Sequence, residues 1–316
     1  MKRRFMFSVC IVVLLAQACV GFTLEPGIYQ RLNGVILLLP LSVLAAFKLM
    51  SLLANTEGEN QWVKVMVPSL FALIIVMTWQ SVTNGYAISK ILLPTPVDIF
   101  AAFWGNLPTL WSDFKQTFLK AVVSGYLIGC CAGFAVAAVA ARSLFLQHCL
   151  LPLGNFVSAI PIIGIAPIMV MWFGFDWQSK AAVVVVMTFF PMFINTLSGL
   201  QSVDPLHKDL MNTYAANSLQ VFLKSELPQA MPFIFNALKL NSTLALIGAI
   251  VAEFFGTPIV GMGFRISTEV GRMNMDMVWA TIVVAALAGS VSYGLLALLE
   301  KMVLFWHPSM RATKHK

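Results

Sequence analysis

The sequence predicts an all-α integral membrane protein with about eight transmembrane helices. The first observation is composition: 59% of the 316 residues are hydrophobic and 10% are charged, whereas a soluble domain has about a quarter charged residues. The second is the length of the apolar runs, because a helix needs about 20 apolar residues to cross the hydrocarbon core. The third is the basic residues beside those runs, which are typical of membrane anchors rather than of nucleic-acid binding, despite a net charge of +7.

Eight apolar runs are candidate spans. In chain order they cover about 5–23, 33–54, 65–84, 117–141, 150–174, 181–200, 233–256 and 278–302. The second contains Lys48, whose long side chain can reach the membrane interface. The sixth contains Pro191, and proline is tolerated in a membrane helix where neighbouring groups satisfy the freed backbone carbonyl.

These spans form two regions. Residues 1–60 are predicted to be a transmembrane hairpin with a polar linker, and residues 61–316 a six-span body. The basic start and the first apolar run also fit a cleaved signal sequence, because Ala-Gln-Ala at 16–18 is a small-residue cleavage pattern. Both interpretations stay open, and we favour a retained first span.

Basic residues set the predicted orientation. They cluster before the first span, at 2–4, and after the last span, at 311–316. Because lysine and arginine concentrate on the cytoplasmic side, both termini are predicted to be cytoplasmic. The order of the spans then places the polar segment 204–228 in the cytoplasm and the loop 257–277 outside.

The segment 204–228 is too regular in its pattern to be a simple loop. Pro205 suits the first turn of a helix and Asp204 its N-cap. Apolar side chains then recur three and four residues apart and form one stripe: Leu206, Leu210, Met211 and Tyr214. A turn at Asn217 and Ser218 leads to a second short helix, 219–226. From these residues alone, a helix lying on lipid and a docking surface for another protein are equally good interpretations.

The same segment resembles the EAA loop of ABC importer permeases, which begins Glu-Ala-Ala, continues with a Gly and ends apolar-x-Leu-Pro. When the two are aligned on Leu227-Pro228, the remaining positions are filled by Asp209, Leu210 and Met211 (Glu-Ala-Ala), Ala215 (Gly) and Ser225 (apolar). Glycine tolerates positive φ and alanine does not, so Asn217 is the candidate for a left-handed residue in this turn.

Four further motifs resemble the nitrate/sulfonate/taurine type of these permeases. They are LLPTPVDIF at 92–100, IPIIGIAPIMVMWFGF at 160–175, FFPMFINTLSGLQSVDP at 189–205 and LALIGAIVAEFFG with GMGFRI within 244–266. Their order and spacing match the family, and the resemblance covers about 90–302. The hairpin at 1–60 departs from the usual six-span pattern of the family.

The resemblance implies a type I importer permease core with an N-terminal two-helix extension in the bacterial inner membrane. Such a permease moves a small polar or anionic solute (a sulfonate, nitrate, bicarbonate, or a vitamin or pyrimidine precursor) by alternating access. It implies three partners: a separate ATP-binding subunit that holds ATP and Mg²⁺, a periplasmic substrate-binding protein and a second copy of the chain. The residues implied to contact the ATP-binding subunit are Asp209, Leu210, Met211, Tyr214, Ala215, Ala216, Asn217, Ser218, Leu227 and Pro228.

Polar residues inside the spans are candidates for the translocation pathway. Glu253 lies in an apolar stretch, where acids often mark ion or substrate paths, and a structural hydrogen bond is the favoured alternative. Asn195, Asn241 and Thr243 have the same two interpretations.

Neither catalysis nor metal binding is expected of this chain. The sequence has no Gly-x-x-x-x-Gly-Lys-Ser/Thr phosphate loop, so ATP hydrolysis is expected in another chain and the protein is not expected to be an enzyme. Its histidines have no metal-site spacing, so no bound metal is expected. Two other classes of function compete with an importer: an ion-coupled secondary transporter and a membrane scaffold.

Overall fold

The computed structural model describes residues 61–158, 160–256 and 259–306, together with 44–45 and 48. All regular structure in these residues is helical. They belong to two compact units, Met1–Asn106 with Glu269–Ala280, and Leu107–Thr268 with Thr281–Lys316. The predicted span 5–23 and nearly all of 33–54 lie outside the described residues, so the 1–60 hairpin stays a prediction.

The first unit contains a spanning helix and a short helix that follows it. The long helix is α4 (Gln61–Gly85) and the short one is α5 (Pro96–Gly105). Pro96 lies in the first turn of α5, and Thr95 caps it by accepting from the N–H of Asp98 at 3.1 Å. The Asp98 carboxylate also pairs with Lys90 at 2.7 Å, which closes the turn between the two helices.

The second unit contains most of the remaining helices. They are α6 (Leu107–Phe114), η2 (Lys115–Val122), α7 (Val123–Ala140), α8 (Leu144–Ser158), α9 (Ile162–Phe173), α10 (Trp177–Gln201), α11 (Pro205–Thr213), α12 (Ser218–Val221), η3 (Phe222–Glu226) and α13 (Leu227–Glu253). The last two helices, α14 (Met262–Gly271) and α15 (Met275–Val303), contribute to both units. Among the described residues, five stretches are long and apolar enough to cross a membrane, and a bent pair makes a sixth when counted as one.

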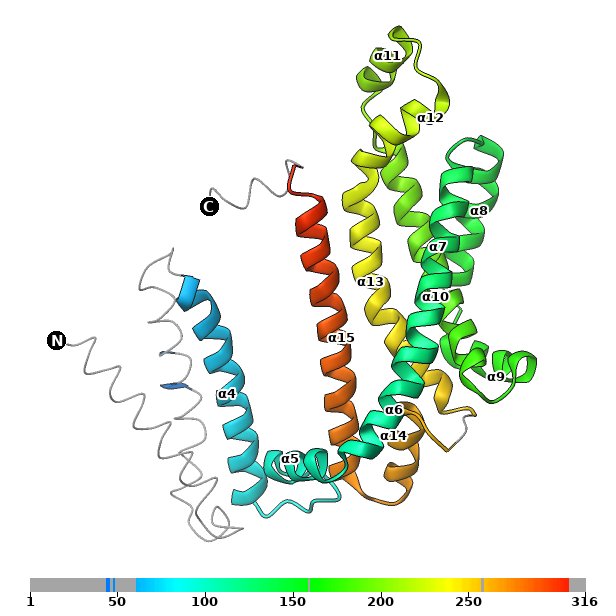
Figure 1. Cartoon of the computed structure of the whole chain (residues 1–316). Coiled ribbons are helices and arrows are strands. Elements are labelled where there is room, and N and C mark those ends of the chain that lie inside the picture. Colours follow the sequence, from blue (N-terminus) through cyan, green and yellow to red (C-terminus); the bar gives the residue numbers. More distant parts are fainter. Residues whose placement is uncertain (1–43, 46–47, 49–60, 159, 257–258, 307–316) are drawn as a thin grey trace, which may run out of the picture. The chain divides into compact units, whose positions relative to one another are not determined.

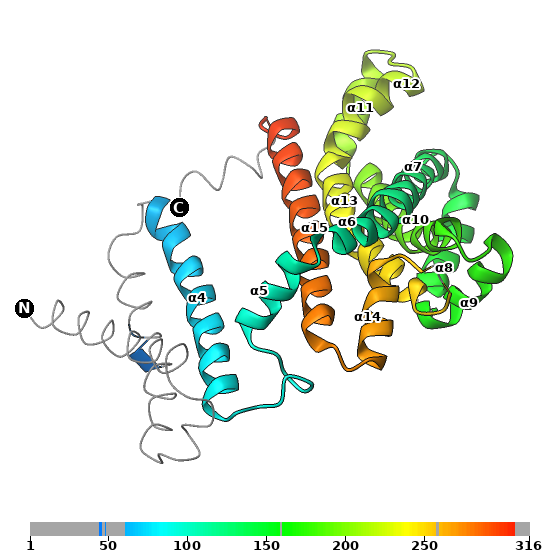
Figure 2. The same cartoon turned by 60° about the horizontal axis from the view of Figure 1, so that its bottom comes forward.

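That bent pair corrects the predicted straight span 150–174. Helices α8 and α9 meet at an angle of 99°, and Figures 1 and 2 show the change of direction. Pro161 has extended backbone angles and precedes the first residue of α9. A proline cannot donate a backbone hydrogen bond, and it keeps the residue before it out of the helical region. The helix therefore breaks here, whereas Pro191 lies within the continuous helix α10.

Three glycines spaced four residues apart on α7 allow it to lie against α10. A Cβ added at Gly125 would lie 2.6 Å from the carbonyl oxygen of Ala181, and one at Gly133 would lie 2.5 Å from that of Phe189. A Cβ at Gly129 would also overlap atoms of α10. In lipid, helices associate through such close packing because leaving the lipid gives no hydrophobic gain. The glycines therefore set the distance between these two helices.

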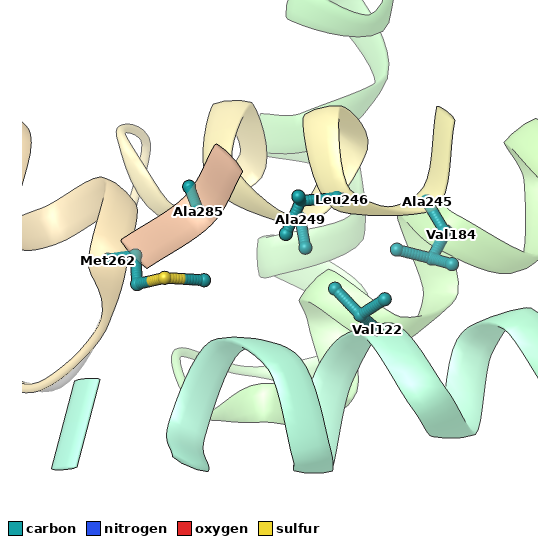
Figure 3. Packing of buried hydrophobic residues seen from close by; sticks show 7 residues of the cluster. All are labelled: Val122, Val184, Ala245, Leu246, Ala249, Met262 and Ala285. Atoms are coloured by element: carbon teal, nitrogen blue, oxygen red, sulfur yellow. The ribbon is translucent and has the colours of Figure 1, made fainter. Parts of the chain in front are cut away.

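A buried apolar cluster joins residues of η2, α10, α13, α14 and α15 (Figure 3). Its members are Val122, Val184, Ala245, Leu246, Ala249, Met262 and Ala285. The side chain of Met262, at the start of α14, is fully buried in this cluster. The three alanines let helix backbones come close, and the larger side chains fill the space between them.

An ion pair joins α13 to α15. The Nζ of Lys239 lies 2.6 Å from Oε2 of Glu300, and both side chains are mostly buried. A single charge at the centre of a spanning helix costs about 3 kcal/mol on insertion scales. Pairing offsets that cost, so the C-terminal half of α15 is held against α13.

The glycine contact gives a testable prediction. Replacing Gly133 with alanine should destabilise the protein by about 1–3 kcal/mol, because α7 must move away from α10 to admit the methyl group. Thermal unfolding in detergent measures the effect. Gly294→Ala in α15 is the matched control, because a Cβ there meets no atom within 4 Å. Equal Tm values for the two variants would contradict the proposed role of the glycines.

Candidate functional site

The segment between α10 and α13, residues 204–228, is the first candidate site and is called the coupling segment below. In both views, α11 and α12 extend beyond the end of α13 (Figures 1 and 2). Helix α13 has 27 residues, which corresponds to a length of about 40 Å. The coupling segment therefore lies at the opposite end of α13 from Glu253, as the predicted order of spans requires.

The start of α11 forms as the sequence predicts. Pro205 is its first residue, and Asp204 Oδ1 accepts from the N–H of Leu206 at 2.9 Å. The proline has no N–H to leave unpaired in the first turn, and the aspartate satisfies one of the free amides there. The chain thus turns sharply from α10 into α11.

The end of α11 is a Schellman turn with Ala215 in the left-handed position. Ala215 has φ +50°, and its N–H donates to the carbonyl of Asn212 at 2.9 Å. The N–H of Ala216 donates to the carbonyl of Met211 at 3.0 Å. Glycine usually fills this position, so alanine here costs about 1–2 kcal/mol of local strain. Ala215 occupies the family's glycine position, and it is thus the left-handed residue of this turn even though it is an alanine.

The expectation that Asn217 adopts positive φ is therefore wrong. Asn217 has extended angles, φ −75° and ψ 163°, and caps the next helix. Its side chain accepts from the N–H of Gln220 at 2.8 Å, and the Gln220 side chain accepts from the N–H of Asn217 at 2.9 Å. This capping box fixes Asn217 in the extended region and leaves the left-handed turn to Ala215.

The second helix of the coupling segment continues into α13 through one wide turn. In η3 the N–H of Leu227 donates to the carbonyl of Phe222, five residues back. Pro228 follows, and in a regular helix its ring would clash with the carbonyl of Lys224. A π-type turn at this point accommodates the proline, so the predicted helix 219–226 and span 233–256 belong to one helical stretch, Ser218–Glu253.

Most of the predicted apolar stripe is exposed. Leu206 is 74% exposed and Tyr214 is 77% exposed. The exposed apolar side chains of the coupling segment are called the α11–α12 surface and comprise Leu206, Leu210, Tyr214, Leu219 and Leu223. Asp209 and Ser218 are also exposed, whereas Leu227 and Pro228 are half-buried. Well-capped helices therefore present large apolar groups that nothing in the described residues covers.

Arg142, just after α7, holds the coupling segment. Its Nη2 lies 2.8 Å from Oε2 of Glu226 and 3.5 Å from the carbonyl oxygen of Ser218. Its guanidinium carbon lies 5.4 Å from the ring centre of Phe222. The Glu226 side chain is 9% exposed, and the Oε2 atom has no aligned hydrogen bond within the described residues. The charge of Arg142 therefore compensates a buried carboxylate.

Glu253 lies in a buried polar network at the other end of α13. Thr117 donates to Oε1 of Glu253 at 2.7 Å, and the N–H of Gly263 donates to Oε2 at 2.6 Å. The Thr117 hydroxyl accepts from the N–H of Met262 at 2.7 Å. Glu253 is 3% exposed, so both carboxylate oxygens are engaged inside the protein. This geometry fits a structural hydrogen bond better than an open path for ions.

Asp113 anchors the same loop from α6. It is fully buried, accepts from the N–H of Gly261 at 2.9 Å and pairs with Nε of Arg265 at 2.8 Å. A Cβ at Gly261, where φ is +151°, would lie 2.7 Å from Oε1 of Glu253. The loop predicted at 257–277 thus contains the helix α14, which two carboxylates fix at its start.

The other pathway candidates also bond within the chain. Asn195 Nδ2 donates to the carbonyl of Pro191 at 2.8 Å, and the Thr243 hydroxyl donates to that of Leu240 at 2.8 Å. Asn241 is fully buried and its Nδ2 donates to the carbonyl of Thr188 at 2.8 Å, which links α13 to α10. A role in the translocation pathway stays a prediction for all of them.

Comparison with known proteins identifies the family. Residues 125–304 match the family described as the binding-protein-dependent transport system inner membrane component, over more than half of the 316 residues. The chain belongs to this family of permeases. The permease is 28% identical over 243 residues to the formylaminopyrimidine transport permease protein ThiX of Halalkalibacterium halodurans, covering 77% of this chain and 96% of ThiX.

A second relative supports the same assignment, and a solved structure shows a similar fold. The permease is 25% identical over 281 residues to the taurine transport system permease protein TauC of Escherichia coli K12, covering 82% of this chain and 98% of TauC. Its fold is similar to that of a solved amino acid ABC transporter, with a TM-score of 0.53 and 16% identity over 64% of this chain and 98% of that chain. The predicted importer-permease fold and family are confirmed, and permeases of this family work with an ATPase and a substrate-binding protein.

Sequence reasoning missed several residues that build these two ends of the permease. Asp113, Thr117 and Arg142 lie far along the chain from the groups they bind, and no local pattern marks them. The glycines at 125, 129 and 133 were a detectable signal, because small residues four apart indicate close helix packing.

The network around Glu253 gives a second prediction. Gly263→Ala should destabilise the permease by about 1–3 kcal/mol, because the added Cβ would meet the carbonyl oxygen of Ile250 and lie 2.8 Å from Cβ of Glu253. Gly271→Ala, at the end of the same helix, is the control, since a Cβ there meets no atom within 4 Å. Thermal unfolding of both purified variants measures the difference in Tm, and an unchanged Tm for Gly263→Ala would refute the tight packing.

Proposed function

We propose that the permease uses the α11–α12 surface to dock on a separate ATP-binding subunit and so drives ATP-dependent import of a small polar or anionic solute. ATP hydrolysis then takes place in the partner, where ATP and Mg²⁺ bind. A periplasmic binding protein delivers the solute, and two copies of the permease form the pathway. Both termini lie in the cytoplasm.

One observation carries this proposal: an apolar surface is held rigidly beyond the end of α13. Leu206, Leu210 and Tyr214 occupy one side of a helix that is capped at its start and closed by a Schellman turn. A short apolar helix that fits a groove on another protein is a common recognition mode. A partner that buries Leu206 and Tyr214 gains roughly 1.5–3 kcal/mol for each side chain.

The same geometry supports movement of the spans by the docked partner. The coupling segment is continuous with α13 through η3 and is bound to the end of α7 through Arg142. Closure of an ATPase dimer on bound ATP brings the two docked segments together. The attached helices then rock as largely rigid bodies and open the pathway to the other side, and hydrolysis resets them.

The substrate class follows from the relatives. ThiX is named for formylaminopyrimidine and TauC for taurine, which are both small polar molecules. We infer a solute of that size and polarity for this permease. Its chemical identity is set mainly by the binding protein, so ligand screening of the genetically paired binding protein is the direct route to it.

The first test is co-purification from the native membrane in mild detergent. Mass spectrometry should find an ATPase with a phosphate-loop motif at about one copy per permease. The absence of an ATPase, together with crosslinks from the coupling segment to lipid alone, would reject docking. In that case transport that depends on the proton motive force would favour an ion-coupled carrier, and no transport would favour a scaffold.

Ala215 gives a sharper prediction at the same surface. It is exposed and left-handed at the centre of the coupling segment. Ala215→Arg keeps the strain of a non-glycine residue but adds a long charged side chain, so it should abolish co-purification of the ATPase while membrane insertion is unchanged. Retention of the ATPase at the wild-type ratio would show that this turn is not buried against the partner.

Two matched variants control for the backbone. Ala215→Ser keeps a small side chain and the same strain, so it should retain the ATPase. Ala215→Gly removes the strain and should stabilise the segment by about 1 kcal/mol without loss of binding. A loss of binding in Ala215→Ser would assign the effect to backbone conformation rather than to the bulk of arginine.

A further inference from the structure

The coupling segment is attached to the rest of the permease in three places. Its start follows α10 directly along the chain, and its end continues into α13 through η3, where one turn is π-type next to Pro228. Arg142 joins it to the end of α7 by non-covalent contacts. These connections contribute to which helices follow a displacement of the segment.

The connection through η3 is easier to bend than the rest of the helix. A π-type turn interrupts the regular i→i−4 ladder, and such turns are frequent at functional sites. Pro228 has no backbone N–H and cannot donate to the carbonyl of Lys224. Bending at this position therefore breaks no hydrogen bond between the two residues. Bending at η3 therefore costs less than bending within α13, and a push on α11 and α12 is partly absorbed there.

Arg142 bridges this π-type turn. It contacts Ser218 at the start of α12, Phe222 at the start of η3 and Glu226 at its end. One guanidinium group thus fixes three positions on successive turns of the same short stretch. Its partner carboxylate is buried, so loss of the guanidinium would leave an uncompensated charge inside the protein.

On its own side Arg142 follows directly from a rigid pair of helices. Ala141 is the C-cap of α7, and the Gly125 and Gly133 contacts hold α7 closely against α10. A force applied through Arg142 is therefore shared by α7 and α10 together. Without Arg142, the same force would reach the bundle through α10 and α13, which continue the segment along the chain, and α7 would follow only through its packing on α10.

We propose that Arg142 is a positioning residue that braces the coupling segment across the η3 turn and carries its movement to the end of α7. The proposal rests on the proposed function, because it requires an ATPase that moves the segment. Glu226 is the matching anchor on the coupling segment. It occupies the position between Ser225 and Leu227, within the apolar-x-Leu-Pro end of the loop.

Hydrogen–deuterium exchange of the purified permease–ATPase complex tests this directly. Deuterium uptake is measured without nucleotide and with ATP plus vanadate. In the wild type, both the stretch 218–226 and the end of α7, residues 136–142, should change their uptake on nucleotide trapping. In Arg142→Gln the change at 218–226 should persist, the change at 136–142 should be lost, and the ATPase should remain bound at the wild-type ratio.

Two further variants separate bracing from simple charge compensation. The double variant Arg142→Gln, Glu226→Gln removes the buried unpaired charge but leaves no ion pair, so it should regain thermal stability while the response at 136–142 stays lost. Arg142→Lys keeps the charge and should restore part of that response. Full recovery of the response in the double variant would overturn the bracing role and leave Arg142 a purely structural partner of Glu226.

The outcome also distinguishes this inference from the proposed function. If no ATPase co-purifies with the wild type and nucleotide changes no part of the permease, the docking proposal fails and this inference fails with it. If the wild type responds to nucleotide and Arg142→Gln responds equally at 136–142, docking stands and only the brace is refuted.

Discussion

The close contact between α7 and α10 is the constraint on which the rest of the permease depends. In a bilayer the surrounding lipid is as apolar as the side chains, so two helices stay together only where their surfaces fit without gaps. The glycines at 125, 129 and 133 supply that fit on α7 by leaving room for the backbone of α10. Once this pair is fixed, α13 packs against it through small side chains and through Asn241, and the polar groups at both ends acquire defined partners.

The two ends of the second unit use buried charge in different ways. Around Glu253 and Asp113, carboxylates bind backbone amides of one loop, so the loop is fixed by many short bonds. Around Glu226, one carboxylate meets one arginine, and the neighbouring α11–α12 surface remains exposed. A densely bonded end is stiff, whereas an end with one ionic contact and one interrupted helical turn can move when a partner acts on it. This difference fits a molecule that receives force at one end and keeps its helices in register at the other.

Much of the fold could be predicted from the sequence, and the exceptions have identifiable physical causes. Length and apolarity were enough for α4, α10 and α15, because the thickness of the bilayer sets their size. The cap at Asp204 followed from local chemistry. The break at Pro161 did not, since Pro191 has the same local chemistry and lies within the continuous helix α10. The partners of Glu253 lie up to 136 residues away in sequence, and Ala215 is left-handed because the hydrogen bonds of its turn outweigh its own preference.

The pair between Lys239 and Glu300 has a consequence for biogenesis. The two residues are separated by 61 positions, so α13 leaves the ribosome well before the acid that neutralises its lysine. During that interval α13 carries an unpaired charge about 18 Å along the helix from Leu227, and lateral transfer into the lipid is opposed by that charge. The charge of Lys239 therefore acquires its partner only when α15 has been synthesised and inserted beside α13. The last helix thus supplies the charge that an earlier one lacks, and chains truncated before Glu300 are left with an unpaired lysine in α13.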